Sequence, residues 1–115
     1  MKKFLAVYLA PVGMYDDMMK NMSPEEQQQS MENWMAWGRR HKENLVDFGA
    51  PAGKNMRVTK DGMTAVRNET SGYTIVSAES HEEAAALFAD SPHLMHEGTS
   101  IDVVALMESV AAENL

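Results

Sequence analysis

Residues 72–107 place a strand, a capped helix, a histidine-bearing loop and a second strand in direct succession. Residues 73–78 are rich in β-prone types, and Ser80 with Glu83 has the spacing of a helix capping box. A second β-prone run covers residues 100–107. Two strands joined by a helix and a loop belong to mixed α and β architectures, so this stretch limits the fold class more than any other part of the chain.

The remaining elements are predicted from caps and periodicity. Residues 3–10 form a first strand, and residues 11–22 lack a clean period and are predicted as a loop. Ser23-Pro24-Glu25-Glu26 has the pattern of a capped helix start, and the apolar periodicity predicts a helix to about Phe48, with Gly49 as its stop. Two short β-prone runs around Asp61-Gly62 predict a hairpin.

The resulting order is β-α-β-β-β-α-β in one domain that spans residues 1–115. This order predicts an α+β ferredoxin-like sandwich, an antiparallel sheet with two helices on one face, with one additional strand. The sequence leaves open which strand of the hairpin joins the main sheet.

The first and last strands predict a partner for the sheet. Phe4, Ala6 and Tyr8 alternate with Leu5, Val7 and Leu9, so both faces of the first strand are apolar. Two helices cover only one face of such a sheet, and soluble chains rarely expose a large apolar face. We therefore expect a homodimer in which two sheets pack together as a dimeric α/β barrel; a monomer with an exposed face is the alternative.

Composition excludes several classes of protein. The net charge of −7 and the scattered basic residues argue against nucleic acid as a partner. The chain has no cysteine, which excludes disulfides and thiol catalysis. No stretch approaches the roughly 20 apolar residues that span a bilayer, so no membrane partner is expected and a cytoplasmic location is predicted. No phosphate loop or dinucleotide fingerprint is present, and no cofactor is predicted.

The loop at Ser91–Gly98 holds the main candidate for chemistry. His93 follows Pro92 directly and is predicted to act as an acid or base in a cleft, because an imidazole titrates near neutral pH. No metal site is predicted. A weaker alternative pairs His93 with His96 as metal ligands, but two histidines at this spacing specify no third ligand.

Other candidates lie on the long helix and the strands. Trp34, Trp37 and His41 could form an aromatic wall with one titratable group, with Tyr8 of the first strand in the same pocket; alternatively Trp34 is core, Trp37 half-buried and His41 a border residue. Asp102 lies inside the apolar last strand, where its carboxylate could orient a histidine in catalysis or pair with a cation.

The chain resembles the YCII-related family, near its DGPF branch, of the dimeric α/β barrel superfamily. The resemblance rests on Gly49-Ala50-Pro51 with Gly53-Lys54, on Gly72–Val76, on Ser91-Pro92-His93-Leu94 and on Gly98–Val103. Ser91 stands where relatives commonly carry Cys, and Arg67-Asn68-Glu69-Thr70 replaces the Asp-Gly-Pro-Phe signature. The resemblance implies a ferredoxin-like dimer with a ligand cleft in each subunit.

Two functional hypotheses follow. The first is a small-molecule pocket, with or without enzymatic activity, in which His93 is the acid or base and the reaction is unspecified. The second is a non-catalytic binding or regulatory module, because some relatives are linked to sigma factors of the extracytoplasmic type. Fold alone does not decide between them.

Overall fold

The structure is a computed structural model that describes residues 1–108 and 110–115. Its elements are β1 (Lys2–Leu9), α1 (Met14–Asn21), α2 (Pro24–Arg40), η1 (Lys42–Asn44), β2 (Leu45–Pro51), β3 (Asn55–Thr59), β4 (Gly62–Val66), β5 (Thr70–Ala78), α3 (His81–Ala86), η2 (Pro92–Met95), β6 (Ser100–Ala105) and η3 (Ala112–Asn114). The C-terminal tail ends in η3, and residue 109 of that tail lies outside the described residues.

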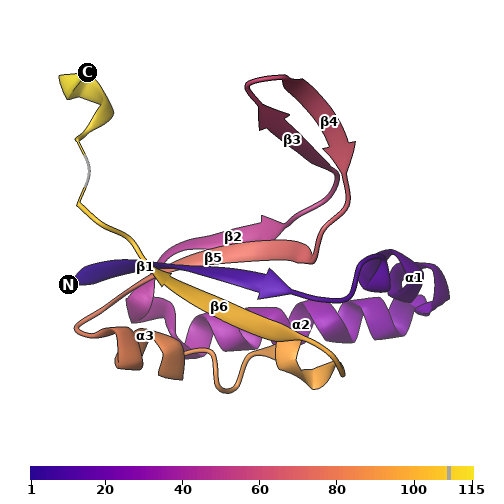
Figure 1. The fold of residues 1–115 in the computed structure, drawn as a ribbon. Helices are drawn as coiled ribbons and strands as arrows, with labels where there is room; N and C mark the ends of the chain where they lie inside the picture. Colours follow the sequence, from indigo (N-terminus) through magenta and orange to yellow (C-terminus); the bar gives the residue numbers. More distant parts are fainter. Residues whose placement is uncertain (109) are drawn as a thin grey trace.

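The main sheet has four strands in the order β2-β5-β1-β6, and every neighbouring pair is antiparallel. α2 and α3 lie together on one side of this sheet (Figure 1). This arrangement confirms the predicted ferredoxin-like α+β sandwich. β1, which carries the apolar run from Phe4 to Leu9, is a central strand with neighbours on both edges.

The predicted extent of the long helix was wrong. α2 ends at Arg40, and residues 45–48, which were assigned to its last turn, belong to the edge strand β2. Gly49 does not stop a helix; it has φ +85° and lies where the register between β2 and β5 shifts. A Cβ atom on Gly49 would lie 1.7 Å from the carbonyl oxygen of Tyr73, so this strand pair can form only with glycine here.

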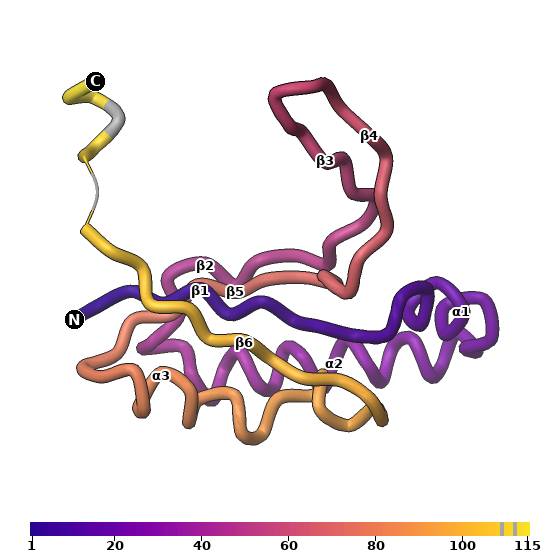
Figure 2. The backbone as a smooth tube through the Cα atoms, in the orientation of Figure 1, coloured from indigo at the N-terminus to yellow at the C-terminus, as the bar shows by residue number. Residues whose placement is uncertain are grey.

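The sequence left open which strand of the hairpin joins the main sheet, and in the structure neither strand does. β3 and β4 pair only with each other, in a separate two-stranded sheet, and β2 takes the place in the main sheet. The hairpin rises from the side of the sheet away from the helices (Figure 2). The Cα radius of gyration is 15.9 Å, whereas a compact domain of this length has roughly 13 Å. We refer to residues 55–66 as the arm.

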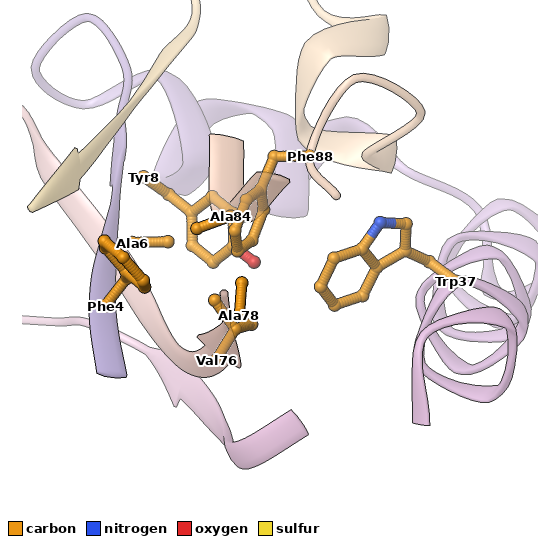
Figure 3. Close-up of a cluster of buried hydrophobic side chains, with 8 residues drawn as sticks. All are labelled: Phe4, Ala6, Tyr8, Trp37, Val76, Ala78, Ala84 and Phe88. Atoms are coloured by element: carbon orange, nitrogen blue, oxygen red, sulfur yellow. The ribbon is translucent and has the colours of Figure 1, made fainter. Parts of the chain in front are cut away.

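The core lies between the main sheet and the helices. Trp37 reaches from α2 toward the side chains of the strands and of α3 (Figure 3). Trp37 is fully buried and donates its indole N–H to the carbonyl of Leu87, at 3.1 Å, while Trp34 is only half-buried. One alternative from the sequence placed Trp34 in the core and Trp37 half-buried. The structure shows the reverse. The other buried apolar residues are Phe4, Ala6, Tyr8, Ala10, Val76, Ala78, Ala84 and Phe88.

Both predicted helix starts are confirmed. In α2 the Ser23 hydroxyl accepts the backbone N–H of Glu26, and the Glu26 carboxylate accepts the N–H of Ser23, which completes the capping box. In α3 the Ser80 hydroxyl accepts the N–H of Glu83. Glycine in the middle of a helix lowers the stability of that helix. At Gly38 close packing requires it, because a Cβ there would lie 2.8 Å from the ring of Phe48.

The segment predicted as an irregular loop contains a helix. α1 begins after Gly13, which has φ +82°, and runs for eight residues over the end of the sheet. Its sequence places Tyr15 and Met18 on one side and exposes Asp17 and Met19. α1 thereby supplies side chains to the site described below.

In the part of the chain that the structure describes, none of α1, α2 and α3 lies over the other face of the main sheet (Figure 1). The register places Leu5, Val7, Ile75 and Val104 together on this open face. Val104 retains 45% of its accessible surface. In the described part of the chain, no helix combines the length and the apolar character that crossing a bilayer requires.

Candidate functional site

A cavity of about 580 Å³ lies between α1, the first half of α2 and the β2–β5 side of the sheet. Methionines and Trp34 make much of its wall, and a few polar groups project into it. Six of its lining residues carry the argument below: Tyr8, Tyr15, Met18, Trp34, Thr74 and His93. A mostly apolar cavity with a few convergent polar groups is the usual form of a small-molecule site.

The loop before β6 places His93 at the end of this cavity. Ser91 caps η2 by accepting the backbone N–H of His93 at 3.2 Å, and Pro92 takes the first position of that turn. Thr99 donates to the carbonyl of His93 at 2.9 Å. Ser91 and His93 are buried, with 3% and 1% of their surfaces exposed. The loop therefore holds the imidazole rigidly.

The hydrogen bonds of His93 define its tautomer. Nε2 lies 2.8 Å from the carbonyl oxygen of Leu9 and 3.1 Å from that of Ser100. Carbonyl oxygens only accept, so Nε2 carries the hydrogen. Nδ1 lies 2.6 Å from the hydroxyl of Tyr15. In the neutral imidazole Nδ1 is the acceptor, so Tyr15 donates its phenolic hydrogen to it.

Burial shifts both partners toward their uncharged forms. Desolvation lowers the pKa of His93 below its ordinary 6.5, against the opposing effect of the Leu9 and Ser100 carbonyls, which favour the charged ring. Desolvation also raises the pKa of the Tyr15 phenol. At neutral pH the pair is therefore a neutral phenol bonded to a neutral imidazole, and the imidazole is ready to accept a proton.

A second hydroxyl chain adjoins this pair. Thr74, fully buried on β5, donates to the carbonyl of Phe48 at 2.7 Å. Its only hydrogen is used there, so the Tyr8 hydroxyl, 2.7 Å from Thr74 Oγ1, must be the donor in that contact. Desolvation raises the pKa of Tyr8 to about 12, so it too stays protonated. The rings of Tyr8 and His93 lie 5.1 Å apart.

The structure brings together some of the sequence-predicted site residues. Tyr8, Trp34 and His93 line the cavity. Trp37 and His41 do not: Trp37 is core, and His41 Nε2 lies 3.0 Å from the Asp90 carboxylate at the other end of α2. His41 and His93 therefore do not form a common site.

Asp102 does not reach His93 either. It pairs in register with Val7 on the open face of the sheet and is exposed. Backbone carbonyls, not a carboxylate, orient the His93 ring. The same contacts bear on the metal alternative with His96: Nε2 of His93 carries a hydrogen and cannot ligate a metal, while Nδ1 faces Tyr15. Among the described residues, no three His, Cys, Asp or Glu side chains gather at one point.

Sequence reasoning missed Tyr15 and Thr74. Tyr15 precedes His93 by 78 positions, and no spacing rule connects them. Its helix was predicted as a loop, so its direction was not considered. The signal that was present is the cluster Met14, Met18, Met19 and Met22 beside Tyr15, because adaptable side chains often surround a ligand.

Comparison with known proteins supports the fold. No protein-family model matches the chain. No curated protein matches it by sequence either. A solved structure that resembles it is 5-chloro-2-hydroxyhydroquinone dehydrochlorinase (TftG) from Burkholderia phenoliruptrix AC1100, in complex with 2,5-dihydroxybenzoquinone. The TM-score is 0.50 at 16% identity, over 87% of this chain and 90% of that one. TftG has the dimeric α/β barrel fold, which agrees with the predicted fold class.

Proposed function

We propose that this protein binds a small, mostly apolar molecule in the cavity and that His93, through Tyr15, accepts a proton from it. One observation carries the proposal: the 2.6 Å contact between Tyr15 Oη and His93 Nδ1, in a ring whose other nitrogen is fixed by two carbonyls. The ring cannot turn away without losing those bonds. The only titrating nitrogen therefore faces the cavity wall.

The proton moves in two linked steps. A bound X–H group donates to the Tyr15 oxygen, and the Tyr15 phenolic hydrogen passes to His93 Nδ1. The X–H bond breaks, X keeps the electron pair, and His93 becomes an imidazolium whose Nε2–H remains on the Leu9 and Ser100 carbonyls. These carbonyls stabilise the positive ring. Tyr15 regains a hydrogen and ends uncharged.

The test uses 4-nitrophenol, an X–H ligand whose ionised form has its own absorbance band. Bound to the wild-type protein, it should ionise at a lower pH than in buffer, since His93 takes its proton. His93→Gln should abolish the shift, and Tyr15→Phe should greatly reduce it because the relay is cut. His41→Gln is the matched control, as His41 lies outside the cavity and contacts Asp90.

Two results would contradict the proposal. The first is 4-nitrophenol bound to the wild-type protein with an unchanged ionisation profile. The second is an ionisation shift that survives in His93→Gln. Binding itself is followed separately, by the Met methyl signals of Met18, Met19, Met22 and Met31, which line the cavity.

We also propose that the protein is a homodimer. The open face supports this assembly, because Leu5, Val7, Ile75 and Val104 cluster there without a covering element of their own chain. Asp102 and Asp47 lie on the same face and make it acidic as well as apolar. A second copy of the chain can cover the face through a two-fold axis.

The arm supports the same partner. Its register puts Met56, Val58, Met63 and Ala65 on one side of the hairpin, and the first three retain 62%, 70% and 73% of their surfaces. An isolated two-stranded hairpin is only marginally stable in water, so an apolar side of this kind needs a surface to pack on. The arm also carries two of the ten basic residues, Arg57 and Lys60. These charges complement the acidic open face of another copy.

Sedimentation equilibrium tests this assembly. The wild-type chain should be a dimer at micromolar concentration, and Val104→Asp on the open face or Val58→Asp on the arm should weaken the dimer at least ten-fold. Val12→Asp is the matched control, since Val12 is exposed in the loop before α1. A wild-type monomer at micromolar concentration would rule the dimer out.

The remaining parts of the proposal rest on the sequence. Membership of the YCII-related family and a cytoplasmic location stay predictions. The alternative function, a non-catalytic binding or regulatory module, draws on the exposed arm and open face. We assign those surfaces to self-association, and the 4-nitrophenol experiment distinguishes a proton-accepting pocket from a passive one.

A further inference from the structure

We infer that the ligand presents a hydrogen-bond donor, a hydroxyl or an amine, to the sheet wall of the cavity, and that anions and purely accepting ligands are rejected. This inference rests on the proposed function, because it concerns the same cavity. It follows from assigning each hydroxyl hydrogen on that wall to the group that accepts it. Hydrogen positions follow from the partners of each group.

The hydroxyl hydrogens on the sheet wall are already donated to other groups of the protein. Tyr8 gives its hydrogen to Thr74, and Thr74 gives its own to the carbonyl of Phe48. Tyr15 gives its hydrogen to His93. Ser71 donates to the carbonyl of Tyr8 at 3.0 Å. The phenolic oxygens of Tyr8 and Tyr15 therefore face a ligand only as acceptors.

The charge on the wall points the same way. No Lys or Arg is among the described residues that line the cavity. Asp16 is the one carboxylate on its rim, and it is exposed and paired with Arg67 at 3.3 Å. A carboxylate or phosphate brings no proton that could convert His93 to its cation, unlike a bound X–H group. It would therefore meet oxygen lone pairs beside a neutral ring, and its desolvation would be uncompensated.

The helix wall differs from the sheet wall. Ser30 and Trp34 line the cavity from α2, and a hydroxyl and an indole N–H can donate. A ligand with both kinds of group would thus be oriented, with its donor toward Tyr8 and Tyr15 and any acceptor toward α2. Trp34 and Tyr8 meet edge to face at 5.2 Å, which shapes an apolar body between the two walls.

A matched series of phenyl compounds tests the inference. 2-Phenylethanol and phenethylamine carry donors, acetophenone and phenylacetate offer only acceptors at neutral pH, and ethylbenzene has no polar group. Affinity is measured from the methyl signals of Met18, Met19, Met22 and Met31 in the intact chain, with the exposed Met1 and Met107 near the chain ends as internal references. The two donors should bind at least about ten-fold more tightly than acetophenone and phenylacetate.

Tyrosine variants identify the acceptors. Tyr15→Phe and Tyr8→Phe should each lose most of the preference for donors while ethylbenzene still binds, which shows that the variant is folded. Ser77→Ala is the matched control, because it also removes one hydroxyl, from a residue of β5 that does not line the cavity.

The outcomes separate the two proposals. Equal or tighter binding of phenylacetate or acetophenone overturns the ligand class, and a 4-nitrophenol shift in the same protein would leave the proton-accepting site standing. A donor preference without a 4-nitrophenol shift supports the ligand class and removes the proton transfer. If none of the phenyl compounds moves the cavity methyl signals, the ligand class is overturned outright.

Discussion

The two faces of the main sheet are built from alternate residues of the same strands, yet they are finished in different ways. Under the helices, Phe4, Thr74 and Val76 are almost completely buried, and every buried side-chain polar atom in the described residues has a hydrogen-bond partner. On the open face, Val104 and Tyr73 remain 45% and 37% exposed. The covered face is complete within one chain, and the open face is not.

The difference teaches where to look for each function. Chemistry needs fixed groups of low mobility and reduced solvation, and only the covered face provides them, at Tyr15 and His93. Association needs accessible apolar area, which the open face and the arm provide. On the proposed function, one sheet serves a ligand on one side and a partner on the other.

Truncating one residue on each face tests this contrast most severely. Phe4→Ala removes a ring that is 98% buried and should cost about 3–5 kcal/mol of unfolding free energy. Val104→Ala on the open face should cost less than about 1 kcal/mol in a monomer. Urea unfolding at two protein concentrations measures both, and the Val104 effect should grow with concentration if the face is covered by a second copy.

Glycine 49 joins the edge strand to the rest of the sheet. Gly49→Ala should destabilise the protein by about 3 kcal/mol, because the new Cβ meets the Tyr73 carbonyl and the positive φ is unfavourable. Gly53→Ala is the matched control: nothing lies within 4 Å of its Cβ position. A stable Gly49→Ala variant, seen by thermal unfolding, would mean that β2 does not hold this register.

The Tyr15–His93 contact should contribute a smaller amount. Tyr15→Phe leaves Nδ1 of His93 without its donor, which should cost about 1–2 kcal/mol. The same variant should raise the pKa of His93, since the lost bond stabilised the neutral ring. Imidazole ¹⁵N NMR titration measures that pKa; Tyr73→Phe should leave it unchanged.

Acidic pH should lower the unfolding free energy of the protein because of His93. Its pKa in the folded chain lies below the unfolded value of 6.5, so the unfolded chain binds more protons and stability falls as pH drops below 6.5. One such group changes the unfolding free energy by at most about 1.4 kcal/mol per pH unit. Urea titrations between neutral and acidic pH should show this slope in wild type and its loss in His93→Gln. A parallel slope in both proteins would exclude His93 as the source.

The parts of the fold that sequence analysis predicted are those with local signals. Ser23 and Ser80 mark the starts of α2 and α3, because each forms a capping pattern with a residue three positions later. The end of α2 was missed because Leu45 and Phe48 continue the helical period, and Gly49 with Pro51 imitates a helix stop. The true reason for Gly49 is the carbonyl of Tyr73, a contact that no local pattern contains.

The site shows the same limit. His93 stood out in the sequence because it follows Pro92 directly, and the structure places it on the cavity. Its partners, Tyr15, Leu9 and Ser100, come from three other segments, and the two carbonyls are backbone groups that any residue would supply. Only the sheet register brings them together, so residue types alone do not reveal the site.

The arm has a consequence for how binding should be measured. β2 and β5 form the cavity wall at Phe48–Ala52 and Ser71–Thr74, and both continue directly into the hairpin. A partner that binds the arm therefore also restrains that wall of the cavity. Ligand occupancy and self-association are then linked equilibria, and each must change the other by the same factor. Binding isotherms recorded at low and high protein concentration should not superimpose.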